Sequence, residues 1–178
     1  MRRIISLLLE NESGALSRVI GLFAQRGYNI ETLAVAPTDD ETLSRLTLTT
    51  VATDEQSEQI TKQLNKLIEV IKLVDLTEGE YVERELMLIK LRVSGLDQAE
   101  IKRTTDIFRG QIVDISPTTY TVQLIGTSKK LDAFIHAMAE FTVIEVVRSG
   151  VSGLSRGCLL YTSPSPRDRT RSRMPSSA

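Results

Sequence analysis

The same order of apolar patterns occurs twice along the chain, and this repetition restricts the folds that the chain can adopt. Residues 1–76 show the patterns of a strand, a helix, two strands, a helix and a strand. Strands are recognised by short apolar runs or by alternation, and helices by apolar residues three and four positions apart. The same order returns in residues 84–157, after a polar stretch over 77–83 that we interpret as a linker. The sequence therefore predicts an α+β fold of two ferredoxin-like βαββαβ domains in tandem.

The first predicted helix has an apolar face of its own. The apolar residues of the helix are Leu16, Val19, Ile20 and Phe23. They fall at i, i+3, i+4 and i+7, which is one face of a helix. The last predicted strand runs over 143–147. A ferredoxin-like sheet carries both helices on one face, so the other face needs a cover or a partner.

The end of the chain, residues 158–178, does not share these patterns. It is rich in Ser, Pro and Arg, and such a composition disfavours a packed core. Its charges are Arg167, Arg169, Arg171 and Arg173 against Asp168, a net of +3, which leaves −4 for residues 1–157 out of the total of −1. We expect a disordered tail that is either native and without function or translated adapter or vector sequence. A basic arm for an anionic partner is the alternative.

The turn Asn11-Glu12-Ser13-Gly14-Ala15-Leu16, between the first strand and helix, is the best candidate for a binding site. A glycine lets a ligand approach bare backbone, and the N–H groups at a helix N-terminus suit a carboxylate. The helix ends at Gly27-Tyr28-Asn29-Ile30, where an asparagine amide can both donate and accept hydrogen bonds. The candidate ligand-binding residues are Asn11, Gly14, Ala15, Leu16, Asn29 and Ile30. Together they could hold a free amino acid. An ordinary glycine-capped connection is the simpler interpretation.

Catalytic machinery is not evident in the sequence. The single histidine, His136, lies within a predicted helix, and the single cysteine, Cys158, lies in the tail. The chain has no Cys-x-x-Cys pair and no glycine-rich phosphate loop. Because no nucleophile, acid–base pair or metal set stands out, we expect no catalytic residues and no metal site in this chain.

Nucleic acid and membrane are not expected as partners. RNA-recognition modules share this strand order but stack bases on strand aromatics, whereas aromatic residues make up 4% here and the strand over 43–51 has none. No apolar run approaches the roughly 18 residues that cross a bilayer. Met1 leads directly into a strand pattern without a signal-peptide cleavage site. We therefore expect a cytoplasmic protein.

Several segments resemble one known family. Its motifs are Asn11-Glu12-Ser13-Gly14-Ala15-Leu16-Ser17-Arg18-Val19, Gly27-Tyr28-Asn29-Ile30, Val35-Ala36-Pro37-Thr38-Asp39, Arg109-Gly110-Gln111-Ile112-Val113-Asp114 and Gly153-Leu154-Ser155-Arg156-Gly157. Residues 1–157 are similar to the small, regulatory subunit of acetolactate (acetohydroxyacid) synthase, with an N-terminal ACT domain over 1–76. The resemblance ends where the tail begins.

The resemblance implies a regulatory role without catalysis. Such a subunit binds the large, thiamine-diphosphate-dependent subunit, which is expected to hold thiamine diphosphate, Mg²⁺ and FAD. It activates that subunit and confers feedback inhibition by valine. ACT domains pair into homodimers with the effector at the interface, so the turn at Asn11, Gly14, Ala15 and Leu16 would come from one chain and Asn29-Ile30 from its mate.

Two questions stay open at this level. A stand-alone ACT module that responds to an amino acid and regulates a different enzyme or a transcription factor is the alternative function. The sequence also does not separate valine from leucine or isoleucine, because one methylene in an apolar pocket changes affinity by only about 1–3 kcal/mol.

Overall fold

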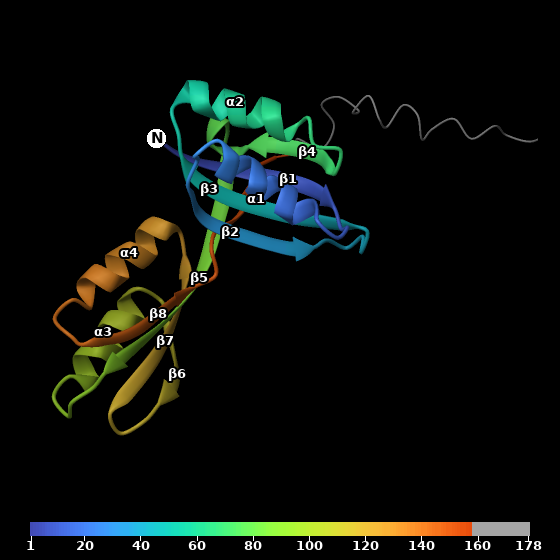
Figure 1. Ribbon diagram of the computed structural model, residues 1–178. Helices are drawn as coiled ribbons and strands as arrows, with labels where there is room; N and C mark the ends of the chain where they lie inside the picture. The colour runs from blue at the N-terminus through green and yellow to red at the C-terminus, as the bar shows by residue number, and fades with distance from the viewer. Residues whose placement is uncertain (158–178) are drawn as a thin grey trace, which may run out of the picture.

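The computed structural model describes residues 1–157 and contains two sheets, each with a pair of helices on one face (Figure 1). The first unit consists of β1 (Arg2–Glu10), α1 (Ala15–Gln25), β2 (Ile30–Pro37), β3 (Leu43–Val51), α2 (Asp54–Leu64) and β4 (Val70–Asp75). A short 3-10 turn, η1 (Leu76–Glu78), follows. The second unit consists of β5 (Tyr81–Arg92), α3 (Gln98–Ile107), β6 (Gln111–Ile115), β7 (Thr119–Gly126), α4 (Ser128–Ala137), β8 (Val143–Arg148) and β9 (Ser152–Ser155). The predicted α+β class and the βαββαβ order are confirmed, whereas the predictions for 158–178 lie outside the described residues.

The first sheet has the antiparallel order β2-β3-β1-β4. Alternate residues of its strands point toward the helices, as their period of two requires. The core between sheet and helices consists of Ile5, Leu7, Leu9, Val19, Phe23, Leu46, Leu48, Ala52, Ile60, Leu64 and Val70. Helix α2 begins with a capping box, in which Thr53 accepts from the Gln56 N–H and the Gln56 side chain accepts from the Thr53 N–H. This cap fixes where the helix starts.

The buried stripe of α1 differs from the predicted face by a small rotation. Ala15, Val19 and Phe23 are its buried residues, while Ile20 is 38% exposed. Leu16 is partly buried against the same core. Ile20 therefore lies at the edge of the predicted apolar face, on the surface.

The second sheet has the order β6-β7-β5-β8 and buries its own core. Phe108 and Phe134 contact each other edge to face, with ring centroids 5.3 Å apart. Met87, Ile89 and Leu91 alternate along β5 and are fully buried. Each unit thus has a separate hydrophobic core, as two tandem domains require.

The segment over 77–83, which we interpret as a linker, contains regular secondary structure. It contains the end of η1 and the start of β5, a strand of 12 residues that runs from one unit into the other (Figure 1). The first residues of β5, Tyr81 to Arg84, pair with β9, a strand that periodicity did not reveal. Because this stretch contains several charged residues, its sequence does not show a strand pattern. Glu83 is nevertheless only 8% exposed, because Arg2 donates to its carboxylate at 3.2 Å.

Strand β9 and the loop before it cover part of the outer face of the first sheet. Val151 is buried with Ile4 and Leu76 in a small apolar cluster. Gly153 packs so closely that a Cβ placed there would lie 2.6 Å from Leu76 Cδ1. The sheet face that needed a cover therefore finds it, in part, within the same chain.

Candidate functional site

The turn after β1 has the backbone that only glycine adopts easily. Gly14 caps α1 with φ = 90° and ψ = −11°, in the left-handed region. The Ala15 N–H points back to the Glu12 carbonyl at 3.3 Å. A Cβ on Gly14 would meet nothing closer than the Arg18 guanidinium at 4.0 Å. Backbone conformation, not lack of space, therefore requires glycine here, and the open space is available to a ligand.

A small cavity adjoins this turn, between the first turn of α1 and the end of β2. Its volume is about 240 Å³, and it is lined by Leu9, Glu10, Asn11, Glu12, Ala15, Leu16, Val35, Ala36, Pro37 and Ser44. Drug-sized ligands occupy pockets of about 300–1,000 Å³, so this cavity suits a smaller molecule. Three of the predicted site residues, Asn11, Ala15 and Leu16, meet here, and Gly14 lies in the turn beside them.

The Asn11 side chain is held in place by the neighbouring loop. Its Nδ2 donates to the Glu41 carbonyl at 2.9 Å, and its backbone N–H donates to the Thr42 carbonyl at 2.7 Å. This bond uses one of the two N–H donors of the amide and fixes its orientation, while Oδ1 can accept from a ligand. An amide oxygen only accepts hydrogen bonds, which suits an ammonium better than a carboxylate.

Asn29 and Ile30 lie at the other end of β2. Ile30 pairs with Thr50, whereas Pro37 pairs with Ser44 at the end near the turn. Seven residue steps along a strand span roughly 23 Å, so one chain does not bring Asn29 and Ile30 to the cavity. Asn29 is exposed, and its backbone carbonyl accepts from Thr50 Oγ1 at 2.6 Å.

Strand β2 is an edge strand of the first sheet. Its outer backbone groups therefore have no neighbouring strand within the sheet of the described chain. Val35 is 44% exposed, and the second half of the strand, from Val35 to Pro37, forms one wall of the cavity. An exposed apolar edge strand is a template for pairing with another chain.

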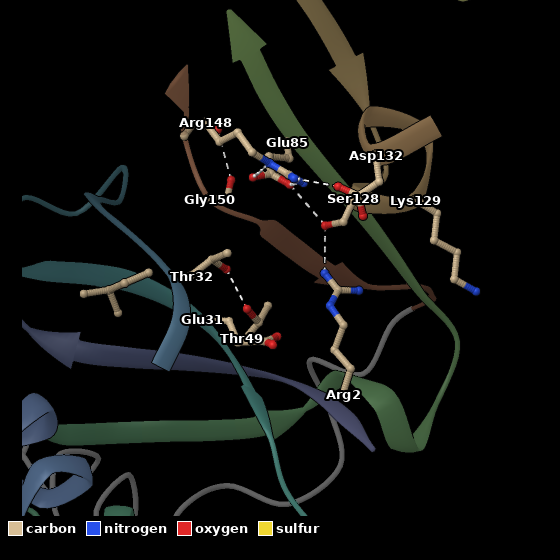
Figure 2. Close-up of a pocket in the computed structure, with 12 residues that line it drawn as sticks. Arg2, Glu31, Thr32, Thr49, Glu85, Ser128, Lys129, Asp132, Arg148 and Gly150 are labelled. Carbon is tan, nitrogen blue, oxygen red and sulfur yellow. Dashed lines mark hydrogen bonds and ion pairs between the residues drawn. The ribbon is translucent and has the colours of Figure 1, made fainter. Parts of the chain in front are cut away.

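A second, larger cleft of about 670 Å³ separates β2 from α4 and the end of β8 (Figure 2). At its base Arg148 donates to both oxygens of the Glu85 carboxylate, from Nε at 2.9 Å and from Nη2 at 2.7 Å. Ser128 Oγ donates to the same carboxylate at 3.1 Å and accepts from Arg2 Nη2 at 2.9 Å. Arg148 Nη1 also donates to Asp132 at 2.7 Å.

At the centre of this network is an ion pair between a buried carboxylate and a partly exposed guanidinium. The Glu85 side chain is completely buried, and that of Arg148 is 30% exposed. The hydrogen bond to Glu85 raises the pKa of Arg148 against the opposing effect of burial, so the guanidinium stays charged. Sequence analysis missed this cleft because its residues come from both halves of the chain and form no local motif.

Within residues 1–157 no cluster of three or more His, Cys, Asp and Glu side chains is arranged to hold a metal ion. None of the helices described here is both long and apolar enough to span a membrane. His136 lies in the last turn of α4.

Comparisons with known proteins assign the family. Residues 5–72 match the AHAS small subunit-like ACT domain, and residues 84–157 match the small subunit of acetolactate synthase. The acetolactate synthase isozyme 3 small subunit of Salmonella typhimurium is 63% identical over 158 residues, which are 88% of this chain and 97% of that protein. The protein of the same name from Escherichia coli is 62% identical over 158 residues. This chain belongs to the acetolactate synthase small-subunit family.

A solved structure agrees with this membership. The crystal structure of the acetolactate synthase small subunit from Thermotoga maritima matches this chain with a TM-score of 0.80 and 36% sequence identity. The match covers 88% of this chain and 98% of that chain. The first sheet, with its glycine turn and its free edge strand, therefore belongs to an ACT domain of this family.

Proposed function

We propose that this chain is the regulatory subunit of a cytoplasmic acetolactate synthase and that it responds to valine. It binds the large catalytic subunit, raises the activity of that subunit and makes it sensitive to feedback inhibition. The observation that carries the proposal is the left-handed Gly14 turn beside a small, partly apolar cavity, within the segment that matches the ACT domain of this family.

Pairing of β2 with a second copy would complete the site. If two β2 strands pair antiparallel about a two-fold axis, the start of each strand meets the end of the other. The start carries Asn29 and Ile30, and the end adjoins the Asn11–Leu16 turn. A homodimer of this kind therefore has two identical sites, each built from the turn of one chain and the Asn29-Ile30 pair of its mate.

The chemistry of this composite site fits an aliphatic amino acid. The N-terminus of α1 carries partial positive charge that favours the ligand carboxylate. The amide oxygens of Asn11 and Asn29 can accept from the ammonium. The apolar wall formed by Leu9, Leu16 and Val35 accommodates a short aliphatic side chain. A free amino acid presents these three groups together.

Catalysis is assigned to the large subunit, together with thiamine diphosphate, Mg²⁺ and FAD. The test is acetolactate formation from pyruvate with these cofactors supplied. We expect no turnover by this chain alone, an increase when it is added to the large subunit, and a decrease on addition of valine. Turnover without the large subunit would refute the assignment.

The stand-alone ACT module remains the second candidate, and the same preparation tests it. Absence of a complex with the large subunit, together with retained binding of valine, would favour that alternative. Calorimetric titration with valine, leucine and isoleucine on one sample then ranks the effectors.

A further inference from the structure

The two units of the chain contact each other in two chemically different places. In one place Ile4 of β1, Leu76 of η1 and Val151 form a buried apolar cluster. The polar cleft of about 670 Å³ adjoins it (Figure 2), because Thr49, which pairs with Ile4, and Gly150, which precedes Val151, both line the cleft. Apolar packing of this kind is dense and resists displacement, whereas partly exposed polar contacts exchange readily with water.

Arg2 is the side chain that reaches across the cleft. It lies on β1 of the ACT domain, and it donates to Glu83 at 3.2 Å and to Ser128 at 2.9 Å. Ser128 opens α4, and through Glu85 it is connected to Arg148 at the end of β8. The Arg2 side chain is 34% exposed, so water can replace its partners when the cleft opens.

The other wall of the cleft is β2, the strand that begins at the candidate effector site. Gly150, with φ = 81°, lies so close to β2 that a Cβ on it would be 3.2 Å from the Leu33 carbonyl oxygen. Leu33 is three residues beyond Ile30. Next to Gly150, the Ser149 N–H donates to the Leu86 carbonyl and its Oγ accepts from the Leu86 N–H, both at 3.0 Å. A shift of β2 would therefore displace the backbone at Ser149 and Gly150, which is hydrogen-bonded to β5 of the second sheet.

We propose that this cleft couples effector binding in the ACT domain to the second domain. The proposal rests on the function proposed above. An effector that contacts Asn29 and Ile30 restrains the start of β2, and the Leu33–Gly150 contact passes that restraint to the end of β8. The network of Arg2, Ser128, Glu85 and Arg148, which we call the cleft latch, holds the closed arrangement. The adjoining apolar cluster of Ile4, Leu76 and Val151 keeps the two units in contact.

Arg2→Ala tests the latch because it removes the contact across the cleft without touching the candidate effector site. The matched control is Arg103→Ala, which removes an ion pair with Glu100 inside α3, at 2.9 Å. We expect the Arg2→Ala subunit to bind valine in calorimetry as the parent does. With the large subunit, the ratio of activities without and with saturating valine should fall by about fivefold or more, the lower range of allosteric coupling. Arg103→Ala should leave that ratio unchanged.

A double-mutant cycle with Ser128→Ala separates coupling from general destabilisation. If both residues act through one contact, the double variant has the same ratio of activities without and with valine as Arg2→Ala alone. The melting temperature of each variant shows that the protein is folded. Hydrogen exchange at the first turn of α4 should slow on addition of valine in the parent and not in Arg2→Ala.

The outcomes distinguish this inference from the proposed function. A parent protein that binds valine and is inhibited, beside an Arg2→Ala variant inhibited to the same extent, would overturn the coupling and leave the function standing. A parent protein that binds no valine would overturn both.

Discussion

Gly14→Asp and Gly14→Asn form a matched pair that tests the effector site through charge alone. The two side chains have nearly the same shape, and both tolerate left-handed backbone better than other residues do. Each also places an oxygen at the N-cap of α1, where asparagine and aspartate cap helices about equally well. Since Gly14 has φ = 90° and no neighbour closer than 4.0 Å to an added Cβ, both variants should fold with similar stability.

The valine affinities of the pair should differ because only Asp adds a negative charge beside the ligand carboxylate. Two like charges about 5 Å apart repel by roughly 3 kcal/mol at an effective dielectric constant near 20. Gly14 is exposed, so screening by water and salt reduces this to about 1–3 kcal/mol. The affinity of Gly14→Asp should therefore be about 5- to 150-fold lower than that of Gly14→Asn.

Calorimetry with valine and a thermal melt on the same samples measure both quantities. Raising the salt concentration should narrow the difference in affinity, because the repulsion is electrostatic. Equal affinities for two folded variants would refute the placement of a carboxylate at this turn. A difference confined to melting temperature would support the interpretation of Gly14 as an ordinary helix cap.

Asn29→Ala should lower valine affinity roughly ten- to a hundredfold, since hydrogen bonds to charged groups contribute about 1.5–3 kcal/mol; unchanged affinity in calorimetry would remove Asn29 from the site. Gly153→Val should lower the free energy of unfolding by about 1–3 kcal/mol in urea titration, because the added atoms would overlap Leu76, whereas Gly79→Ala, with nothing within 4 Å of its Cβ, serves as the control. Removal of residues 158–178 should leave the melting temperature, dimerisation and valine affinity unchanged; a drop of several degrees would show that the tail supports the fold.

The sequence by itself determined the class of the fold and the glycine turn between its first strand and first helix. Local signals carry both: alternation in strands such as β3, helical spacing in α1, and a glycine where the chain leaves β1. These patterns depend on residues a few positions apart, so they can be read without knowing what packs against them. The capping box at Thr53 and Gln56, which the structure reveals, likewise joins residues only three positions apart and fixes the start of α2.

The tertiary structure decided the features that depend on contacts between residues far apart in the sequence. The short strand β9 has no pattern of its own and exists because Tyr81 to Arg84 offers it a partner. Glu83 and Glu85 look like solvent-exposed acids in the sequence, yet both are buried because arginines distant in sequence donate to them. The free edge of β2 and the distance of Asn29 and Ile30 from the glycine turn likewise emerge only when the strands are ordered in a sheet. Burial and strand order depend on which distant residues contact each other, and a local sequence pattern does not contain that information.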